Sequence, residues 1–404
     1  MKETIQELAD RFYAEMKQLR FSEAALRHTG LVLSQIVRWH LQNAKEGLDV
    51  NILDEYTKVS TERLMRDKIG RAYSQLQIYT TKRLLEFSET GKLEFHRIQM
   101  PRTVLNPYFD SILAEYLEDR LKTVKSTKRI AWSIRRFAQW LISQRIENLT
   151  DVDAQTVRLF IMDSAKQLRD SSLVNLRSDM RIFFQWAYKQ GYTTDSFAAL
   201  FDFSVSVERK IHPAPLPEEV ALVLNAIERT TVEGKRDYAI IMLGIVTGLR
   251  AGDVASLKLP DIDWRNGEIK IIQGKTEKSL ALPLTQDVGE ALSDYILNAR
   301  PQCGTDKIFL RTRAPIQPLA SGSAICGVYG KYRRRLSLTA QGFHSLRRAL
   351  GKNLVTSGVP VTIVAQVLGH SDISNTKQYI ALDTVHLKEC ALDFTGIAPK
   401  RGAI

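Results

Sequence analysis

A short proline-rich segment divides this sequence into two parts with different hydrophobic patterns. Pro213, Pro215 and Pro217 fall within five positions of the stretch SVSVERKIHPAPLPEE. Proline removes a backbone donor and disfavours the helical conformation of the residue before it, so residues 204–217 are predicted to be an extended linker between domains. Before the linker, apolar residues recur at helical spacing, whereas after it helical and strand-like patterns alternate.

Two helical regions precede the linker. Residues 1–100 are predicted to form an N-terminal helical domain, and residues 106–203 carry stronger helical patterns such as IAWSIRRFAQWLISQ. The stretches around Trp39 and Trp140 are similar, each being followed by a polar break and another helical pattern. Two interpretations stay open: a duplicated helical domain, or two amphipathic helical hairpins that are alike by chance.

The region after the linker, residues 218–404, has a mixed pattern. The stretches LPEEVALVLNAIE and KRDYAIIMLGIVTG predict helices, and GEIKIIQ and SLALPL flank GKTEK as the strands of a β-hairpin do. A chain of 404 residues is long enough for two or three domains. We therefore expect a multidomain, mainly α protein of the α+β class, with a small hairpin or sheet in the last domain.

Composition narrows the partners of the protein. The chain has 57 Lys and Arg against 45 Asp and Glu, a net charge of +12, which favours either a polyanion such as nucleic acid or a merely solvated basic surface. Its three cysteines suggest neither a disulfide framework nor a zinc site. Because no apolar run resembles a signal peptide or a membrane span, we expect a protein that stays inside the cell.

Five short stretches follow one another after the linker. They are TGLRAGDV with Arg250, QGKTEK with Lys275, HSLR with His344 and Arg347, LGHS with His370, and NTKQYIALD with Tyr379. Their order and spacing resemble the tyrosine recombinase (phage integrase) family, in which the nucleophile follows the LGH histidine by nine residues, as Tyr379 follows His370. The resemblance covers residues 216–394, and residues 106–202 are similar to the SAM-like core-binding domain of that family.

The chemistry of these residue types can be argued without the family. An enzyme that breaks and rejoins a phosphodiester without a high-energy cofactor needs a nucleophile that conserves the bond energy, and a tyrosine does so as a phosphotyrosyl ester. Arg250 and Arg347 suit the charged transition state because a guanidinium donates two parallel hydrogen bonds to phosphate oxygens. No His, Asp and Glu set has metal spacing, so we expect no metal and no other cofactor.

The resemblance implies a role for each remaining residue. Tyr379 is the nucleophile, and Lys275 delivers a proton to the leaving 5′ oxygen, with Lys278 of the same turn as its competitor. His344 takes the proton of the tyrosine and contacts the phosphate, and His370 donates a further hydrogen bond to a phosphate oxygen.

Basic residues close to the site and on the helical region before the linker are predicted to contact the DNA backbone. They are Lys331, Arg333, Arg334, Arg335, Arg348, Arg135 and Arg136. Tyr295, Tyr329 and Tyr332 could compete with Tyr379 as the nucleophile. We interpret Tyr295 as a packing residue of an amphipathic helix, and the other two as packing and DNA-backbone contacts.

The function implied by the resemblance is site-specific recombination through a 3′-phosphotyrosyl intermediate, for the integration, excision or transposition of a mobile element. The implied partners are double-stranded DNA and three further copies of the chain in a tetramer on DNA. Accessory directionality proteins or host DNA-bending proteins are further expected partners, and a membrane is not. The expected location is the bacterial cytoplasm, on the nucleoid.

Two other functions fit parts of the pattern. A type IB topoisomerase shares the tyrosine chemistry but reseals a single strand without joining two sites. A noncatalytic DNA-binding regulator would need the basic residues but not the full set of Arg, Lys, His and Tyr. The segment after Tyr379 begins with a helical pattern, and it is expected to pack either on its own domain or on a neighbouring copy.

Overall fold

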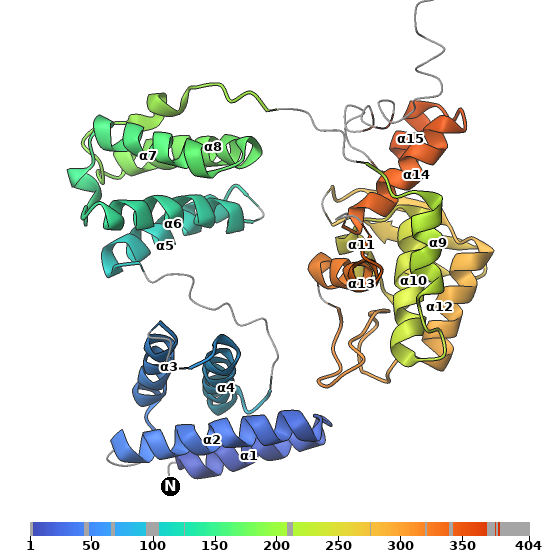
Figure 1. The fold of residues 1–404 in the computed structure, drawn as a ribbon, viewed down its shortest axis with the longest axis horizontal. Coiled ribbons are helices and arrows are strands. Elements are labelled where there is room, and N and C mark those ends of the chain that lie inside the picture. Colours follow the sequence, from blue (N-terminus) through green and yellow to red (C-terminus); the bar gives the residue numbers. More distant parts are fainter. Residues whose placement is uncertain are drawn as a thin grey trace, which may run out of the picture. The chain divides into compact units, whose positions relative to one another are not determined.

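The structure is a computed structural model of the chain. It describes residues 3–43, 48–65, 69–93, 105–124, 126–207, 213–274, 276–319, 321–338 and 342–369, together with Thr376 and Tyr379; of residues 64, 65 and 71 only the backbone is described. Residues 99–210 form one compact unit, and residues 1–98 with 211–404 form the other. Each part is described below by itself (Figure 1).

The N-terminal part is helical. Its helices are α1 (Ile5–Gln18), α2 (Glu23–Asn43), α3 (Val50–Met65) and α4 (Arg71–Thr90). Helix α1 begins with a capping box, in which the Thr4 hydroxyl accepts from the Glu7 N–H and the Glu7 carboxylate accepts from the Thr4 N–H. The apolar faces of these helices form a core of their own.

The part before the linker is also helical. It contains α5 (Pro107–Leu121), α6 (Lys128–Ser143), α7 (Ala154–Gln167) and α8 (Asp170–Lys189), with short 3₁₀ turns at Leu149–Asp151 and Phe197–Phe201. Asp153 caps α7, since its carboxylate accepts from the Thr156 N–H at 2.7 Å. The core is rich in aromatic rings, including Phe137, Phe183 and Phe184.

Among the described residues, each helical part has four α-helices, and in each the second helix has a tryptophan in contact with an aromatic ring of the third. Trp39 of α2 lies 5.9 Å, between ring centroids, from Tyr56 of α3. Trp140 of α6 lies 5.6 Å from Phe160 of α7. Counted from the two tryptophans, buried positions of α2 and α6 coincide: Val32, Leu33, Ile36 and Val37 correspond to Ser133, Ile134, Phe137 and Ala138.

A second aromatic pair joins the first and fourth helices in both parts. Phe12 of α1 lies 5.6 Å from Phe87 of α4, with the rings edge to face. Tyr116 of α5 lies 5.0 Å from Trp186 of α8. Two matching ring pairs and matching buried positions are more than a shared amphipathic period requires, because that period fixes spacing within a helix and not the partners between helices.

In the part after the linker, α10 (Val232–Thr247) is the central helix. It packs against α11 (Ala251–Ser256), α12 (Gln286–Asn298), α13 (Gly322–Arg335) and α14 (His344–Thr356). Buried residues lie all round α10, which is the pattern of a helix enclosed by others. The surrounding helices therefore hold fixed positions relative to α10.

A small antiparallel sheet completes this core. Strands β1 (Ile262–Asp263), β2 (Glu268–Ile272) and β3 (Ser279–Pro283) lie in this order, with β2 in the centre. Ile269 faces Leu282 across the β2–β3 pair, and both are buried. The alternation of buried and exposed residues along β2 is that of a sheet with one covered face.

The remaining elements are α9 (Pro217–Asn225), the 3₁₀ turn Leu259–Asp261 and α15 (Val361–Val367). The predicted mainly α fold with a small hairpin is confirmed, with β1 as an added edge strand. Of the predicted linker, residues 208–212 lie outside the described residues, and its last residue, Pro217, is the first of α9. No helix in the described part is long and apolar enough to span a membrane.

Candidate active site

The turn between α10 and α11 positions Arg250. Helix α10 ends at Thr247, and Gly248 has φ +62°, a left-handed conformation that glycine adopts without a steric penalty. Leu249 is then buried, and Arg250 is the residue that precedes α11. The Arg250 side chain is 20% exposed, so its guanidinium lies at the border between the core and solvent.

Arg347 reaches the same turn from α14. Its side chain is buried, Nη1 donates to the Gly248 carbonyl at 2.8 Å, and Nη2 donates to the Leu368 carbonyl. Burial, and to a smaller extent the nearby charge of Arg250, lower the pKa of Arg347 to about 10, while Tyr379 and Asp253 act in the opposite direction. Two carbonyl acceptors therefore hold a cation that its surroundings disfavour.

Tyr379 is buried against the same helix. A Cβ placed on Gly351 of α14 would lie 2.9 Å from the Cε1, Cε2 and Cζ atoms of the Tyr379 ring, so the ring rests on the backbone at this glycine. Burial raises the pKa of the Tyr379 hydroxyl, whereas the charge of Arg347 and hydrogen bonding to it lower that pKa, as does the charge of Arg348. The phenol and the guanidinium therefore influence each other directly.

The site has an excess of positive charge. Among the described residues, Asp253 is the carboxylate within ion-pair distance of this arginine pair, with Oδ2 at 3.8 Å from Arg250 Nη1. Its other oxygen accepts from the Gly274 N–H at 3.0 Å. One carboxylate beside two guanidinium groups leaves a net charge that an anion would balance. Arg250 and Arg347 can therefore bind a phosphate group next to the Tyr379 ring.

His344 begins the helix that carries Arg347. It is the first residue of α14, its side chain is exposed, and it precedes Arg347 by one helical turn. The buried Phe343 precedes it and packs in the core, which fixes where α14 begins. His344 therefore shares a helix with Arg347 and with Gly351, on which Tyr379 rests.

The predicted Lys275 and His370 lie outside the described residues. The structure does place their neighbours: Gly274 and Thr276 belong to the turn between β2 and β3, and the Gly369 carbonyl accepts from Arg250 Nη2 at 3.5 Å. Lys278, the competitor of Lys275, has an exposed side chain.

Comparison with known proteins connects this geometry with a family. Residues 216–386 match the phage integrase family, and residues 131–191 match the N-terminal SAM-like domain of phage integrases. The integrase/recombinase y4rF of Sinorhizobium fredii is 30% identical over 315 residues, which cover 74% of this chain and 72% of that protein. The chain belongs to the phage integrase family. The resemblance to tyrosine recombinases found in the sequence is thereby confirmed.

Other relatives and solved structures agree with this assignment. The protein y4rA of the same bacterium is 29% identical over 268 residues, 66% of this chain and 65% of that protein, and the tyrosine recombinase XerC of Oceanobacillus iheyensis is 26% identical over 298 residues, 70% and 94%. The integrase of transposon Tn1549 has a TM-score of 0.53 at 16% identity, covering 70% of this chain and 99% of that structure. A λ integrase structure has a TM-score of 0.52 at 20% identity, covering 75% and 86%. These structures share the fold of the recombinase.

Several of the predicted DNA-contacting residues have protein partners. In α13, Lys331 Nζ lies 2.8 Å from a carboxylate oxygen of the buried Asp237, and Arg333 donates to the Leu338 carbonyl at 3.2 Å. Arg348 donates to the carbonyl of Pro213 in the linker. Lys331, whose side chain is 43% exposed, therefore neutralises part of the charge of the buried Asp237 from the surface.

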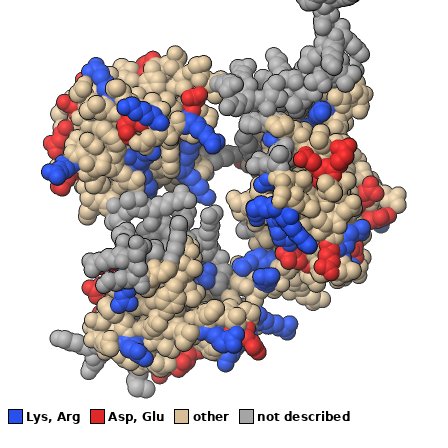
Figure 2. Space-filling model, in the orientation of Figure 1, with Lys and Arg blue, Asp and Glu red and all other residues tan. Residues whose placement is uncertain are grey.

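The other predicted contact residues lie on α13 and α6. Arg334 and Arg335 are exposed at the end of α13. Arg135 lies 3.8 Å from the Asp110 carboxylate, and Arg136 donates to the Gln167 side chain at 2.8 Å. Figure 2 shows basic side chains in patches on the described surface, with acidic side chains between them.

Some residues of the site were not predicted from the sequence. Asp253 stands three residues after Arg250 inside a quoted motif, and a carboxylate at that spacing on a helix start was a usable signal. Gly351 and Gly369 gave no such signal, because their importance depends on which side chains approach them from other elements. Tyr295, Tyr329 and Tyr332 are all buried, as packing residues are.

Proposed function

We propose that this recombinase cleaves and rejoins DNA strands by attack of Tyr379 on a phosphodiester, with a 3′-phosphotyrosyl intermediate. The observation that carries the proposal is the arginine pair: Arg250 and Arg347 converge beside the Tyr379 ring with Asp253 as their neighbouring carboxylate. A phosphate in this place meets two guanidinium groups, and its transition state carries more negative charge than its ground state.

The proposed reaction conserves bonds and charge. The Tyr379 oxygen bonds to phosphorus while the bond from phosphorus to the 5′ oxygen breaks, and Lys275 gives a proton to that oxygen. His344 receives the proton of the tyrosine, and His370 donates a hydrogen bond to the phosphate. In the second step, a 5′ hydroxyl of another strand attacks the phosphotyrosine and releases Tyr379. We propose that this chemistry uses neither a metal ion nor another cofactor.

We further propose that the recombinase works on double-stranded DNA as a tetramer. A structure of the related λ integrase fold is of a tetramer bound to a Holliday junction. Four copies supply one Tyr379 for each strand that two DNA sites must exchange. Directionality proteins or host DNA-bending proteins are the proposed accessory partners, and the proposed location is the bacterial cytoplasm, on the nucleoid.

We propose four segments: residues 1–100 as an N-terminal helical domain, 106–203 as the core-binding domain, 204–217 as the linker, and 218–404 as the catalytic domain with its tail. Separate hydrophobic cores in the three larger segments support this division. The matching ring pairs favour a common origin of the first two domains.

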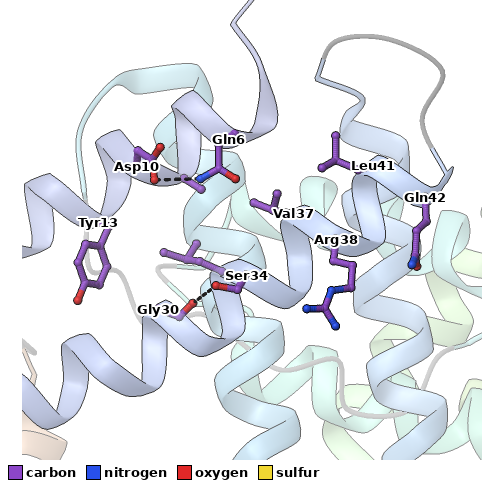
Figure 3. A pocket seen from close by; sticks show the side chains of 11 residues that line it. Gln6, Asp10, Tyr13, Gly30, Ser34, Val37, Arg38, Leu41 and Gln42 are labelled. Carbon is purple, nitrogen blue, oxygen red and sulfur yellow. Dashed lines mark hydrogen bonds between the residues drawn. The ribbon is translucent and has the colours of Figure 1, made fainter.

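We propose that the N-terminal domain also binds DNA. A groove between α1 and α2 is lined by Tyr13, Ser34 and Arg38 among others (Figure 3). Arg38 and Arg27 are exposed on α2 and lie three helical turns apart, hence on one face of the helix. Two cations so placed suit a phosphate backbone.

The biological role we propose is the integration, excision or transposition of a mobile element. The fold is shared with the integrase of transposon Tn1549. A type IB topoisomerase is the second candidate, because it would use the same tyrosine chemistry.

A nicked duplex tests the enzymatic proposal. If the strand beyond the scissile phosphate is short enough to dissociate, the covalent adduct accumulates and is visible as a slower band on a denaturing gel. We expect the adduct in the presence of EDTA, and we expect exchange between two labelled sites. In a parallel assay on a supercoiled plasmid, relaxation without exchange between the labelled sites would favour the topoisomerase. The absence of any adduct on the nicked duplex would refute both proposals.

A further inference from the structure

Gln273 begins the turn that joins β2 to β3. Its N–H donates to the Lys278 carbonyl at 2.9 Å, and its carbonyl accepts from the Glu277 N–H at 2.8 Å. The next residue, Gly274, donates to Asp253, the neighbour of Arg250. The turn that contains Lys275 in its sequence is thus closed at both ends and tied to α11.

The side chain of Gln273 lies inside this turn. It is fully buried, and its Oε1 accepts from the Thr276 hydroxyl at 2.8 Å. Strand residues just before the turn alternate between buried and exposed, so the buried Gln273 continues the inward-facing row of Ile269 and Ile271. A polar side chain in that row needs a reason other than packing.

The amide of Gln273 lies against Gly369, two residues after α15 ends. A Cβ placed on Gly369 would lie 2.4 Å from Nε2 and 2.6 Å from Oε1 of Gln273. Gly369 has φ +61°, so its conformation also favours glycine. The close approach therefore depends on glycine for two independent reasons, space and backbone conformation.

The segment that Gln273 contacts is hydrogen-bonded to both arginines of the site. The Gly369 carbonyl accepts from Arg250, and the Leu368 carbonyl accepts from Arg347. His370 follows directly in the sequence. The amide of Gln273 is thus the contact between the turn that contains Lys275 and the segment held by both arginines.

The amide nitrogen of Gln273 has no hydrogen-bond partner among the residues that the structure describes. A buried N–H without a partner is costly, and side chains that only fill space are rarely amides. This amide nitrogen lies at the contact between the β2–β3 turn and the segment that follows α15.

We propose that Gln273 is a positioning residue, which holds the turn containing Lys275 against Gly369 and thereby sets the proton donor relative to the phosphate bound by the arginines. This inference rests on the proposed function of Lys275 and Tyr379. Gln273 acts through its neighbours and does not touch the reacting atoms.

The leaving group can separate this role from a merely structural one. An alkoxide needs a proton as it leaves, whereas a thiolate does not, because a thiol has a pKa near ~8.5. In a nicked duplex with sulfur in place of the bridging 5′ oxygen, the position of the proton donor loses its effect on the cleavage rate. Binding of the DNA, attack by Tyr379 and stabilisation of the phosphate by the arginines are required in the same way for the two substrates.

We expect Gln273→Ala to slow cleavage of the oxygen substrate by about 10-fold or more, since general acid catalysis contributes about 10²–10⁴-fold and is sensitive to placement. Cleavage of the sulfur substrate should stay within about threefold of wild type. Thr276→Val removes the hydroxyl that binds Gln273 and keeps the side-chain shape, so it should give the same pattern with a smaller loss. Gln286→Ala, at an exposed glutamine whose side chain donates to Glu290, is the matched control and should leave both rates unchanged.

Two outcomes would overturn the positioning role: equal losses on both substrates in Gln273→Ala and Thr276→Val, or no loss on either substrate. If Gln273→Ala does not fold, Thr276→Val decides alone. Failure of the proposed function itself would look different, because wild type would then form no adduct with the sulfur substrate or Tyr379→Phe would still form one.

Discussion

At the scale of single residues, the site is built around a charge that the fold alone does not favour. Burial and Arg250 both lower the pKa of Arg347, whereas the charge of Asp253, which lies within ion-pair distance of Arg250, raises it. Groups with perturbed pKa values cluster at functional sites. A DNA phosphate between the two guanidinium groups would relieve their repulsion and bring phosphorus to Tyr379.

Arg347→Lys tests the geometry of this charge. Lysine keeps the charge but is a point donor, so it cannot hold the Gly248 and Leu368 carbonyls and also bind a phosphate oxygen. We expect adduct formation on the nicked duplex to fall by about 10²- to 10³-fold, with DNA binding in a gel-shift assay nearly unchanged. Arg158→Lys, at an exposed arginine of α7, is the control; equal losses in both variants would contradict the role of Arg347.

Gly351→Ala tests whether the contact with Gly351 holds the ring of Tyr379 in place. The added methyl would stand 2.9 Å from three ring atoms of Tyr379, so the ring must move. A displacement of this size is expected to lower the rate of adduct formation by about 100-fold.

Gly327→Ala in α13, where a Cβ has open space, is the matched control for Gly351→Ala. It should leave the rate of adduct formation unchanged. If Gly351→Ala cleaves DNA at the wild-type rate, the ring is not held by this contact.

The residue scale also shows what sequence could predict. Arg250, Arg347 and Tyr379 were found because their motifs occur in a fixed order, and the structure brings these three together. Gln273 and Gly351 were missed because their contacts reach across elements: Gln273 meets Gly369 and Gly351 meets Tyr379 only in the folded chain. The spacing of residues within a motif does not predict contacts between residues that are far apart in the sequence.

At the scale of elements, α10 and α14 must approach closely to place Arg347. A Cβ on Gly244 of α10 would lie 2.6 Å from the Phe343 ring and 2.9 Å from Leu346. The glycine thus lets the start of α14 lie directly on α10. His344 and Arg347 obtain their positions from this contact.

Gly244→Ala is therefore expected to destabilise the catalytic domain. Alanine normally stabilises a helix interior by about 1 kcal/mol relative to glycine, but overpacking a tight core costs about 1–3 kcal/mol. Hydrogen exchange of α10 amides in the full chain measures the local opening free energy. We expect it to fall in Gly244→Ala and not in Gly327→Ala; a rise in Gly244→Ala would mean that α14 does not need this close contact.

Element boundaries were predicted less well than element types. The hairpin strands were expected where β2 and β3 lie, because their apolar residues alternate. The helix expected from Lys235 begins earlier, at Val232, because the Thr231 hydroxyl accepts from the Gly234 N–H at 2.9 Å and caps the helix there. Strand β1 has only two residues and no period of its own, so it depends on pairing with β2.

At the scale of the whole molecule, the two helical parts before the linker share two ring pairs and four buried positions but differ in their surfaces. On α6, Arg135 and Arg136 occupy the positions that Ser34 and Gln35 occupy on α2, counted from Trp140 and Trp39. The shared positions are those that form the helix contacts, whereas the positions that differ are not buried. The N-terminal domain would then contact a different stretch of DNA.

A footprint tests the proposed DNA contact of the N-terminal domain. In a full chain with both Arg27→Glu and Arg38→Glu, we expect the protected DNA to shorten on one side, because two phosphate contacts become repulsive. Cleavage of a short nicked duplex should be retained. Lys58→Glu on α3, also exposed, is the control; an unchanged footprint in the double variant would refute the contact.

The central claim is that Tyr379 forms the covalent bond to DNA, and the adduct itself tests it. The adduct from the nicked duplex is digested with a protease, and the nucleotide-linked peptide is sequenced by mass spectrometry. We predict one modified residue, Tyr379, joined to a 3′ phosphate, and no adduct from Tyr379→Phe. A link to another residue or to a 5′ phosphate, or an adduct that persists in Tyr379→Phe, would contradict the account.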